Sequence, residues 1–175
     1  WELHMPSWQV ISIYESLFEM GSPLGLKDFG GQAFNSMRLE KMYRAYGAEF
    51  TEEISALEAG MERFLDLNRD FIGADNIRER MSSGIKTKLA YLVFDDQVPA
   101  ECFGNEAVFS DGELTGIITS GAYGHRVGHS IAFAYLKTEH CNDGASLTVE
   151  TSLGSRSCHV SMNASYDQTN EKLCS

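Results

Sequence analysis

One stretch decides the fold class of this chain: AVFSDGELTGII, residues 107–118. Two apolar runs meet at Asp111-Gly112, and this two-residue connection predicts a β-hairpin because glycine tolerates the positive φ of a type I′ turn. Beyond the hairpin, apolar runs alternate with turn residues such as Asn142-Asp143-Gly144 and predict strands at residues 89–94, 130–136, 146–151 and 156–162. Short strands separated by turns indicate a small antiparallel barrel or a sandwich.

The first half of the chain has apolar residues at helical spacing instead, predicting helices over about residues 8–21, 35–42 and 74–82. Residues 63–67 fit a helix or a strand, with the strand favoured, and residues 1–6 indicate another strand. Trp1 and Trp8 are expected in the core. Because the chain starts inside an apparent strand, we expect a piece of a longer polypeptide, with a domain boundary near residues 83–86.

The composition narrows the possible partners. The chain has 175 residues, which is enough to bury a hydrophobic core without disulfide or metal cross-links. Its formal net charge is −11, and the negative charge is spread over both halves. Such a surface repels phosphate backbones and anionic lipids, so we expect neither nucleic acid nor membrane as a partner. The four cysteines form no C-x-x-C pair and predict reduced thiols in an intracellular protein.

Generic catalytic and metal motifs are absent from the sequence, including the P-loop, G-x-S-x-G, G-x-G-x-x-G and H-E-x-x-H. His125 and His129 have the spacing of metal ligands on a helix, but no acidic or cysteine ligand accompanies them. Two histidines at a loop and a strand edge are the favoured interpretation. We therefore expect no metal site and name no catalytic residue.

Two polar segments each allow two interpretations. Arg38 and Glu40 flank Leu39, which should be buried, and an ion pair or backbone clamp is favoured over direct ligand contact. The run from Thr119 to His125 is polar and rich in glycine. It is either a plain strand-to-strand turn or a cofactor-facing loop with Tyr123 as a stacking or hydrogen-bonding wall.

Glu2 is the carboxylate with the most specific chemistry to offer. A carboxylate accepts two hydrogen bonds in one plane, which suits a pterin or guanine-like ring with adjacent N–H donors. From the residues alone, a solvated strand edge is the favoured interpretation of Glu2.

Several colinear stretches together cover most of the chain: GQAFNSMRLEK (31–41), YRAYGAE (43–49), LEAG (57–60), DFIG (70–73), TSGAYGH (119–125) with SIA (130–132), and YDQTNE (166–171). They resemble segments of the dimethylglycine dehydrogenases, which belong to the same superfamily as the glycine-cleavage T-protein. The opening Trp1-Glu2-Leu3 resembles the end of a motif of that family whose glutamate hydrogen-bonds the pterin ring of tetrahydrofolate.

The resemblance implies an α+β fold. Residues 1–85 would be the C-terminal part of a folate-binding aminomethyltransferase-like domain, and residues 86–175 a small C-terminal antiparallel β-barrel. The implied cofactor is tetrahydrofolate, with Glu2 and Tyr123 as cofactor-binding residues. FAD would belong to the parent protein and would not be bound by this piece. The aspartate that the family places near the folate nitrogens has no counterpart here.

The implied function is that of a piece of a tetrahydrofolate-linked one-carbon enzyme resembling dimethylglycine or sarcosine dehydrogenase, supplying part of the site where a methylene group is captured. Alone, this piece should be inactive. The alternatives are a flavin-free aminomethyltransferase of the T-protein type and a non-catalytic regulatory relative. Phe34 stands where T-proteins carry arginine, which favours the dehydrogenase branch, whereas Gln168 replaces the proline of the family ending.

The resemblance implies that the folate-binding domain is incomplete in this chain, and the expected partners follow from that. Besides folate, we expect the missing N-terminal part, another subunit or self-association, since a half-domain exposes an apolar face. The expected location is the cytoplasm, or the mitochondrial matrix in a eukaryote.

Overall fold

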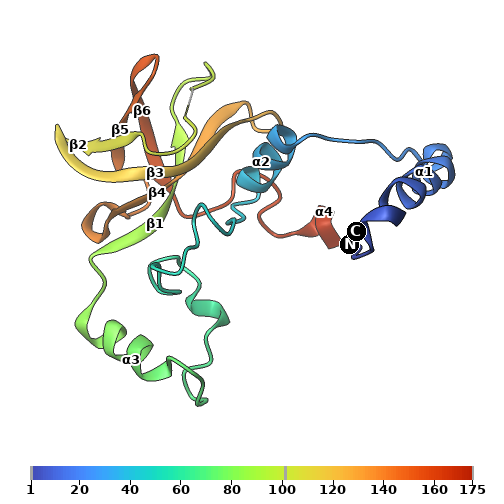
Figure 1. Ribbon diagram of the computed structural model, residues 1–175. Helices are drawn as coiled ribbons and strands as arrows, with labels where there is room; N and C mark the ends of the chain where they lie inside the picture. The colour runs from blue at the N-terminus through green and yellow to red at the C-terminus, as the bar shows by residue number, and fades with distance from the viewer. Residues whose placement is uncertain (1, 101, 175) are drawn as a thin grey trace. The chain divides into compact units, whose positions relative to one another are not determined.

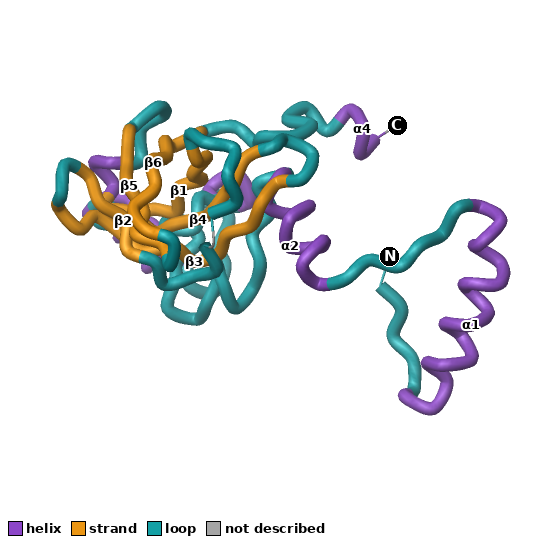
Figure 2. Tube along the Cα trace, turned by 90° about the horizontal axis from the view of Figure 1, so that it is seen from above, coloured by secondary structure: helices purple, strands orange, loops and turns teal. Residues whose placement is uncertain are grey.

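The second half of the chain closes into an antiparallel barrel. The computed structural model describes residues 2–100 and 102–174, and within them the strand order around the barrel is β1-β4-β3-β2-β5-β6, with β6 pairing back onto β1. Figures 1 and 2 show the strands gathered in one closed body. The bounds are β1 Thr87–Phe94, β2 Ala107–Ser110, β3 Glu113–Gly124, β4 His129–Lys137, β5 Ser146–Thr151 and β6 Gly154–Ser161. The barrel expected from the sequence is confirmed.

The hairpin between β2 and β3 has the predicted geometry. Asp111 and Gly112 have φ values of 50° and 83°, both positive as a type I′ turn requires, and Ser110 pairs with Glu113 across the turn. The strands predicted at 89–94, 130–136, 146–151 and 156–162 are also confirmed, with ends that differ by a residue or two.

Strand β1 is buried on both of its faces. Ala90, Leu92 and Phe94 point into the barrel core, whereas Leu89 and Tyr91 join a second cluster outside the barrel. Helix α2 (Gly31–Glu40) covers this outer face and contributes the fully buried Leu39 to the second cluster. An apolar run with little polar alternation is what a strand covered on both faces requires.

The helical segments agree less closely with the predictions made from the sequence. Helix α2 begins four residues before the predicted start, and the predicted helix at 74–82 is confirmed as α3. The strand favoured at 63–67 is wrong, because this segment holds a 3-10 turn and has no neighbouring strand with which to pair. The bounds are η3 Glu62–Phe64, α3 Ala74–Ser83, η4 Thr138–His140 and α4 Glu171–Cys174.

Residues 1–33 form a compact unit separate from residues 34–175, and each unit is described by itself. The first unit contains η1 Ser7–Gln9, α1 Val10–Gly21 and η2 Ser22–Leu24. The strand expected at residues 1–6 is wrong for Glu2 to Pro6, which pair with no strand, and Trp1 lies outside the described residues. The expected domain boundary near residues 83–86 stays a prediction.

No described residue of the first unit is buried. Trp8 is 77% exposed, so its expected place in a core is wrong. The physical reason is size: one helix with its flanking turns has no second layer against which to bury an apolar face. Among the described helices of either unit, none is both long and apolar enough to cross a membrane.

Candidate functional site

Glu2 lies in the extended segment that precedes η1. Its side chain is 84% exposed, and its Oε1 lies 3.2 Å from Nε2 of the equally exposed His4. So exposed a contact contributes little to stability and is easily exchanged for another partner. The Glu2 carboxylate is therefore available to donors from a ligand.

Tyr123 lies at the end of β3 in the second unit and is half-buried. Its ring meets the ring of His125 edge-on, with 5.3 Å between centroids. The Tyr123 hydroxyl makes no hydrogen bond within residues 2–100 and 102–174, so it is free to meet a ligand. Glu2 and Tyr123 belong to different units. The cofactor-binding role of both residues stays a prediction.

The segment Thr119–His125 is not the strand-to-strand turn considered above. Residues 119–124 continue strand β3, and the turn follows at residues 125–128. Both interpretations took residues 119–124 for a turn or a loop, which is wrong because glycine here serves a close approach of two segments: a Cβ built on Gly121 would lie 2.4 Å from the carbonyl oxygen of Cys102. A side chain at this position would force strand β3 away from the neighbouring loop.

Helix α2 is fastened along this part of β3 by hydrogen bonds from polar side chains of its last turns. The contacts run in the same order along both segments: Asn35 Nδ2 to the Gly121 carbonyl (3.1 Å), Ser36 Oγ to the Tyr123 carbonyl (2.8 Å), and the Arg126 N–H to Glu40 Oε1 (2.6 Å). The stretches 31–41 and 119–125 are therefore binding partners of each other.

Arg38 and Glu49 form a buried ion pair beneath these contacts. Arg38 Nη1 lies 2.9 Å from Glu49 Oε2, with exposed side-chain fractions of 8% and 0%. Arg38 Nε donates to Asn35 Oδ1 at 2.8 Å, and Nη1 also donates to the Tyr43 carbonyl at 3.0 Å. Arg38 and Glu40 thus clamp the backbone, which confirms the favoured structural interpretation of the Arg38–Glu40 segment.

The Glu49 carboxylate also receives donors from the barrel. Oε1 accepts hydrogen bonds from Thr119 Oγ1 (2.9 Å) and from Ser120 Oγ. Adjacent residues of a regular strand point to opposite faces, but the pairing of β3 with β4 shifts register between Ile118 and Ser120. This bulge lets both hydroxyls reach the same carboxylate. Glu49 ends the quoted stretch 43–49, but no local pattern indicates its partners on β3, which lie some 70 residues away in the chain.

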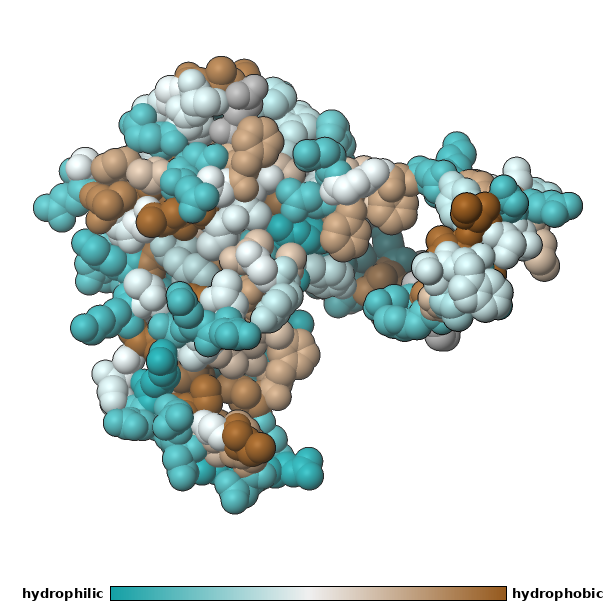
Figure 3. All heavy atoms as spheres, in the orientation of Figure 1, coloured by the Kyte–Doolittle hydropathy of each residue, from teal (hydrophilic) through white to brown (hydrophobic). Residues whose placement is uncertain are grey.

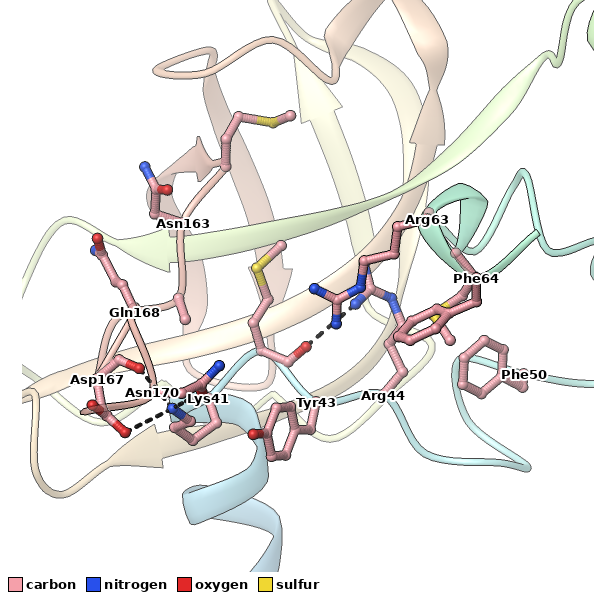
Figure 4. A pocket seen from close by; sticks show the side chains of 15 residues that line it. Lys41, Tyr43, Arg44, Phe50, Arg63, Phe64, Asn163, Asp167, Gln168 and Asn170 are labelled. Carbon is pink, nitrogen blue, oxygen red and sulfur yellow. Dashed lines mark hydrogen bonds and ion pairs between the residues drawn. The ribbon is translucent and has the colours of Figure 1, made fainter. Parts of the chain in front are cut away.

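The C-terminal segment is held by Lys41, the residue that follows α2. Lys41 Nζ contacts Asp167 through its carbonyl (2.6 Å) and its carboxylate (2.9 Å), and it reaches Asn170 Oδ1 at 2.6 Å (Figure 4). The Lys172 N–H and Lys41 together lower the pKa of the Asp167 carboxyl. Tyr91 donates to or accepts from Ser165 Oγ at 2.9 Å, and burial raises its pKa to about 12.

Neither histidine of the 125–129 pair has metal-site surroundings. His129 Nδ1 lies 3.1 Å from the Phe94 carbonyl, and His125 contacts the Tyr123 ring. In the part of the chain that the structure describes, no three His, Cys, Asp or Glu side chains gather as a metal site would require.

Two family models match this chain. The model described as GCVT N-terminal domain matches residues 1–69, and the model described as glycine cleavage T-protein C-terminal barrel domain matches residues 88–167. A crystal structure of glycine cleavage system aminomethyltransferase T from Bartonella henselae superposes with a TM-score of 0.81, covering 94% of this chain and 45% of that one. Because the sequence identity is only 20%, this match supports the fold alone.

Curated relatives are similar over most of the chain. Mitochondrial dimethylglycine dehydrogenase of Mus musculus is 37% identical over 86% of the chain, and mitochondrial sarcosine dehydrogenase of the same species is 30% identical over 78%. An aminomethyltransferase of Thermoanaerobacter pseudethanolicus is 28% identical over 85%. The chain spans 17%, 15% and 40% of the lengths of these relatives, respectively.

Proposed function

The chain belongs to the glycine-cleavage T-protein family, and from this premise we propose that it supplies part of the tetrahydrofolate site of a longer one-carbon enzyme. Glu2 would hydrogen-bond the pterin ring, and Tyr123 of the second unit is the other cofactor-binding residue that we propose. The observation that carries the proposal is the Glu2 carboxylate, 84% exposed and paired only with an exposed histidine among the described residues.

The residues present fit one part of a folate site. The two oxygens of Glu2 can accept from neighbouring N–H groups of a pterin, and charged acceptors make the stronger class of hydrogen bond. The unpartnered Tyr123 hydroxyl adds a donor or an aromatic face. When bound, tetrahydrofolate would supply the nitrogen atoms that capture a one-carbon unit, while this chain would bind and orient it.

The dehydrogenase branch is the preferred parent. Identity is higher to dimethylglycine dehydrogenase, at 37%, than to the aminomethyltransferase, at 28%. In such a parent, a flavin in another domain would oxidise an N-methyl amine such as dimethylglycine or sarcosine. A flavin-free aminomethyltransferase is the second candidate, favoured by the two T-protein domain matches. A non-catalytic regulatory relative is the third candidate. For a eukaryotic source we propose a location in the mitochondrial matrix, because the dehydrogenase relative is named as mitochondrial.

The test is calorimetric titration of the chain with 5-formyltetrahydrofolate, a stable reduced folate. We expect Glu2→Gln to weaken binding roughly 10- to 100-fold, because a charged hydrogen bond contributes about 1.5–3 kcal/mol. Glu15→Gln is the matched control, since Glu15 is also exposed in the first unit and should leave the affinity unchanged.

Equal binding by the original chain and Glu2→Gln would refute the role of Glu2. Should the isolated chain bind no folate, the same variants are compared in the longer polypeptide. There, the non-catalytic alternative predicts no folate binding at all.

The first unit also needs a covering partner. Trp8, Ile11 and Tyr14 are 77%, 71% and 48% exposed, and Figure 3 shows hydrophobic atoms open on the surface of this unit. We propose that the rest of the folate-binding domain covers this apolar face in the parent protein. A patch of this kind drives association when its natural cover is absent.

The isolated chain should therefore self-associate. We expect light scattering to give a mass above that of a monomer, rising with concentration, and Ile11→Gln to shift the mass towards the monomer. Glu19→Gln, on the exposed surface of the same helix, should have no such effect. A clean monomer at every concentration would contradict the proposal.

A further inference from the structure

A hollow of about 530 Å³ lies in the second unit. Neither Glu2 nor any residue of the barrel strands lines it. Its walls come from the segments after α2, around η3 and after β6 (Figure 4). This size falls within the roughly 300–1,000 Å³ typical of small-molecule sites. Aromatic side chains of Tyr43, Phe50 and Phe64 line part of it.

One end of this hollow is already neutral. Lys41 is satisfied there by the Asp167 carboxylate and by Asn170. The side-chain amides of Asn163 and Gln168 also line the hollow, and neither makes a hydrogen bond to a residue within 2–100 or 102–174. These amides are free to donate to, or accept from, a guest.

The other end holds two guanidinium groups without an anion. Arg44 and Arg63 lie close enough to influence each other, and neither forms an ion pair with any described residue. Burial and the charge of Arg63 lower the pKa of Arg44. The nearby carboxylates of Glu49 and Glu62 are engaged elsewhere, with Arg38 and Lys88. In a chain of net charge −11, this local excess of positive charge is unusual.

Arg44 is fixed in place rather than mobile. Its Nε donates to the Ala59 carbonyl at 2.7 Å, and its guanidinium lies 5.7 Å from the centre of the Phe133 ring. A Cβ on Gly60 would come within 3.1 Å of Arg44 Nη2, so glycine leaves room for the guanidinium. Arg63 lies over the ring of Phe64, at 4.5 Å from its centre, and is the exposed member of the pair.

We propose that this hollow binds a small organic anion, with its carboxylate or phosphate group between Arg44 and Arg63 and its flat, apolar body along Phe50 and Phe64. Guanidinium groups bind both kinds of oxyanion through paired hydrogen bonds. The proposal is independent of the folate site, because neither Glu2 nor Tyr123 lines the hollow.

The test uses amide NMR titrations of the whole chain with phthalate, phenyl phosphate and the neutral benzamide. We expect one or both anions to shift the amide signals of residues 41–44, 60–64 and 162–170 at about millimolar concentration, with benzamide much weaker. Tighter binding of phthalate would indicate a carboxylate ligand, and tighter binding of phenyl phosphate would indicate a phosphate ligand. Arg63→Gln should weaken its binding roughly tenfold or more, since a charged hydrogen bond is lost.

Arg69→Gln is the matched control, because Arg69 is exposed and lies outside the hollow. It should leave the affinity unchanged, as should Glu2→Gln, which separates this site from the proposed folate site. Three results would each overturn the proposal: no shifts with either anion, equal binding of benzamide, or an equal loss in Arg69→Gln.

Discussion

Arg38→Met should be the most damaging single change in this protein, lowering the free energy of unfolding of the second unit by about 3–5 kcal/mol. The substitution keeps an unbranched apolar stem but leaves the Glu49 carboxylate, 0% exposed, without its counter-ion. It also removes the donors to Asn35 and to the Tyr43 carbonyl. Urea denaturation followed by circular dichroism measures the loss.

The pair Arg80–Glu58, of which the arginine is solvent-exposed, provides the control for Arg38→Met. Arg80 is 51% exposed, and Arg80→Met should cost less than about 1 kcal/mol because solvent screens such a pair. The double variant Arg38→Met with Glu49→Leu should regain part of the loss, since no unpaired charge is left buried. A loss in Arg38→Met no larger than that in Arg80→Met would show that the clamp is not the source of stability.

Leu39→Ala should cost about 2–5 kcal/mol, the second of the large effects. Leu39 is fully buried in the cluster outside the barrel, where it packs with Tyr91 and Phe133, whose ring centroids are 5.5 Å apart. Truncation removes apolar contacts and leaves a cavity that the flanking ion pairs hold open. Thermal or urea unfolding of the variant reports the change.

Met37→Ala on the same helix is the matched control for Leu39→Ala. Met37 is 46% exposed, so the same truncation should cost well under half as much. Similar losses for both variants would mean that helix α2 does not pack its Leu39 face on the barrel.

These two predictions bear on the function of the sequence motifs. Residues 31–41 and 119–125 carry much of the family resemblance, yet several of their polar groups bind this protein itself: Asn35 and Ser36 donate to carbonyls of β3, and Thr119 donates to Glu49. These contacts hold the last turns of helix α2 against the barrel. Within these motifs, the hydroxyl of Tyr123 is the group proposed to face a ligand.

The candidate sites differ in how far sequence could foresee them. Glu2 was found through a short motif beside it in the chain, and such a signal is local. The pair Arg44 and Arg63 carries no local signal, since an arginine becomes an anion ligand only when no carboxylate folds against it. The same holds for Glu49, whose donors at 119 and 120 are some 70 residues away.

The sequence by itself determined the hairpin at Asp111-Gly112, the strands around it and the burial of Leu39, because turn chemistry and apolar patterning act over a few residues. The strands predicted at residues 2–6 and 63–67 are wrong, because a strand needs a partner strand and the local pattern does not show whether one is present. Only the tertiary structure decided that the run from Thr119 continues a strand and bulges so that two hydroxyls face Glu49. The bulge depends on register against β4, and register is a property of paired strands rather than of one segment.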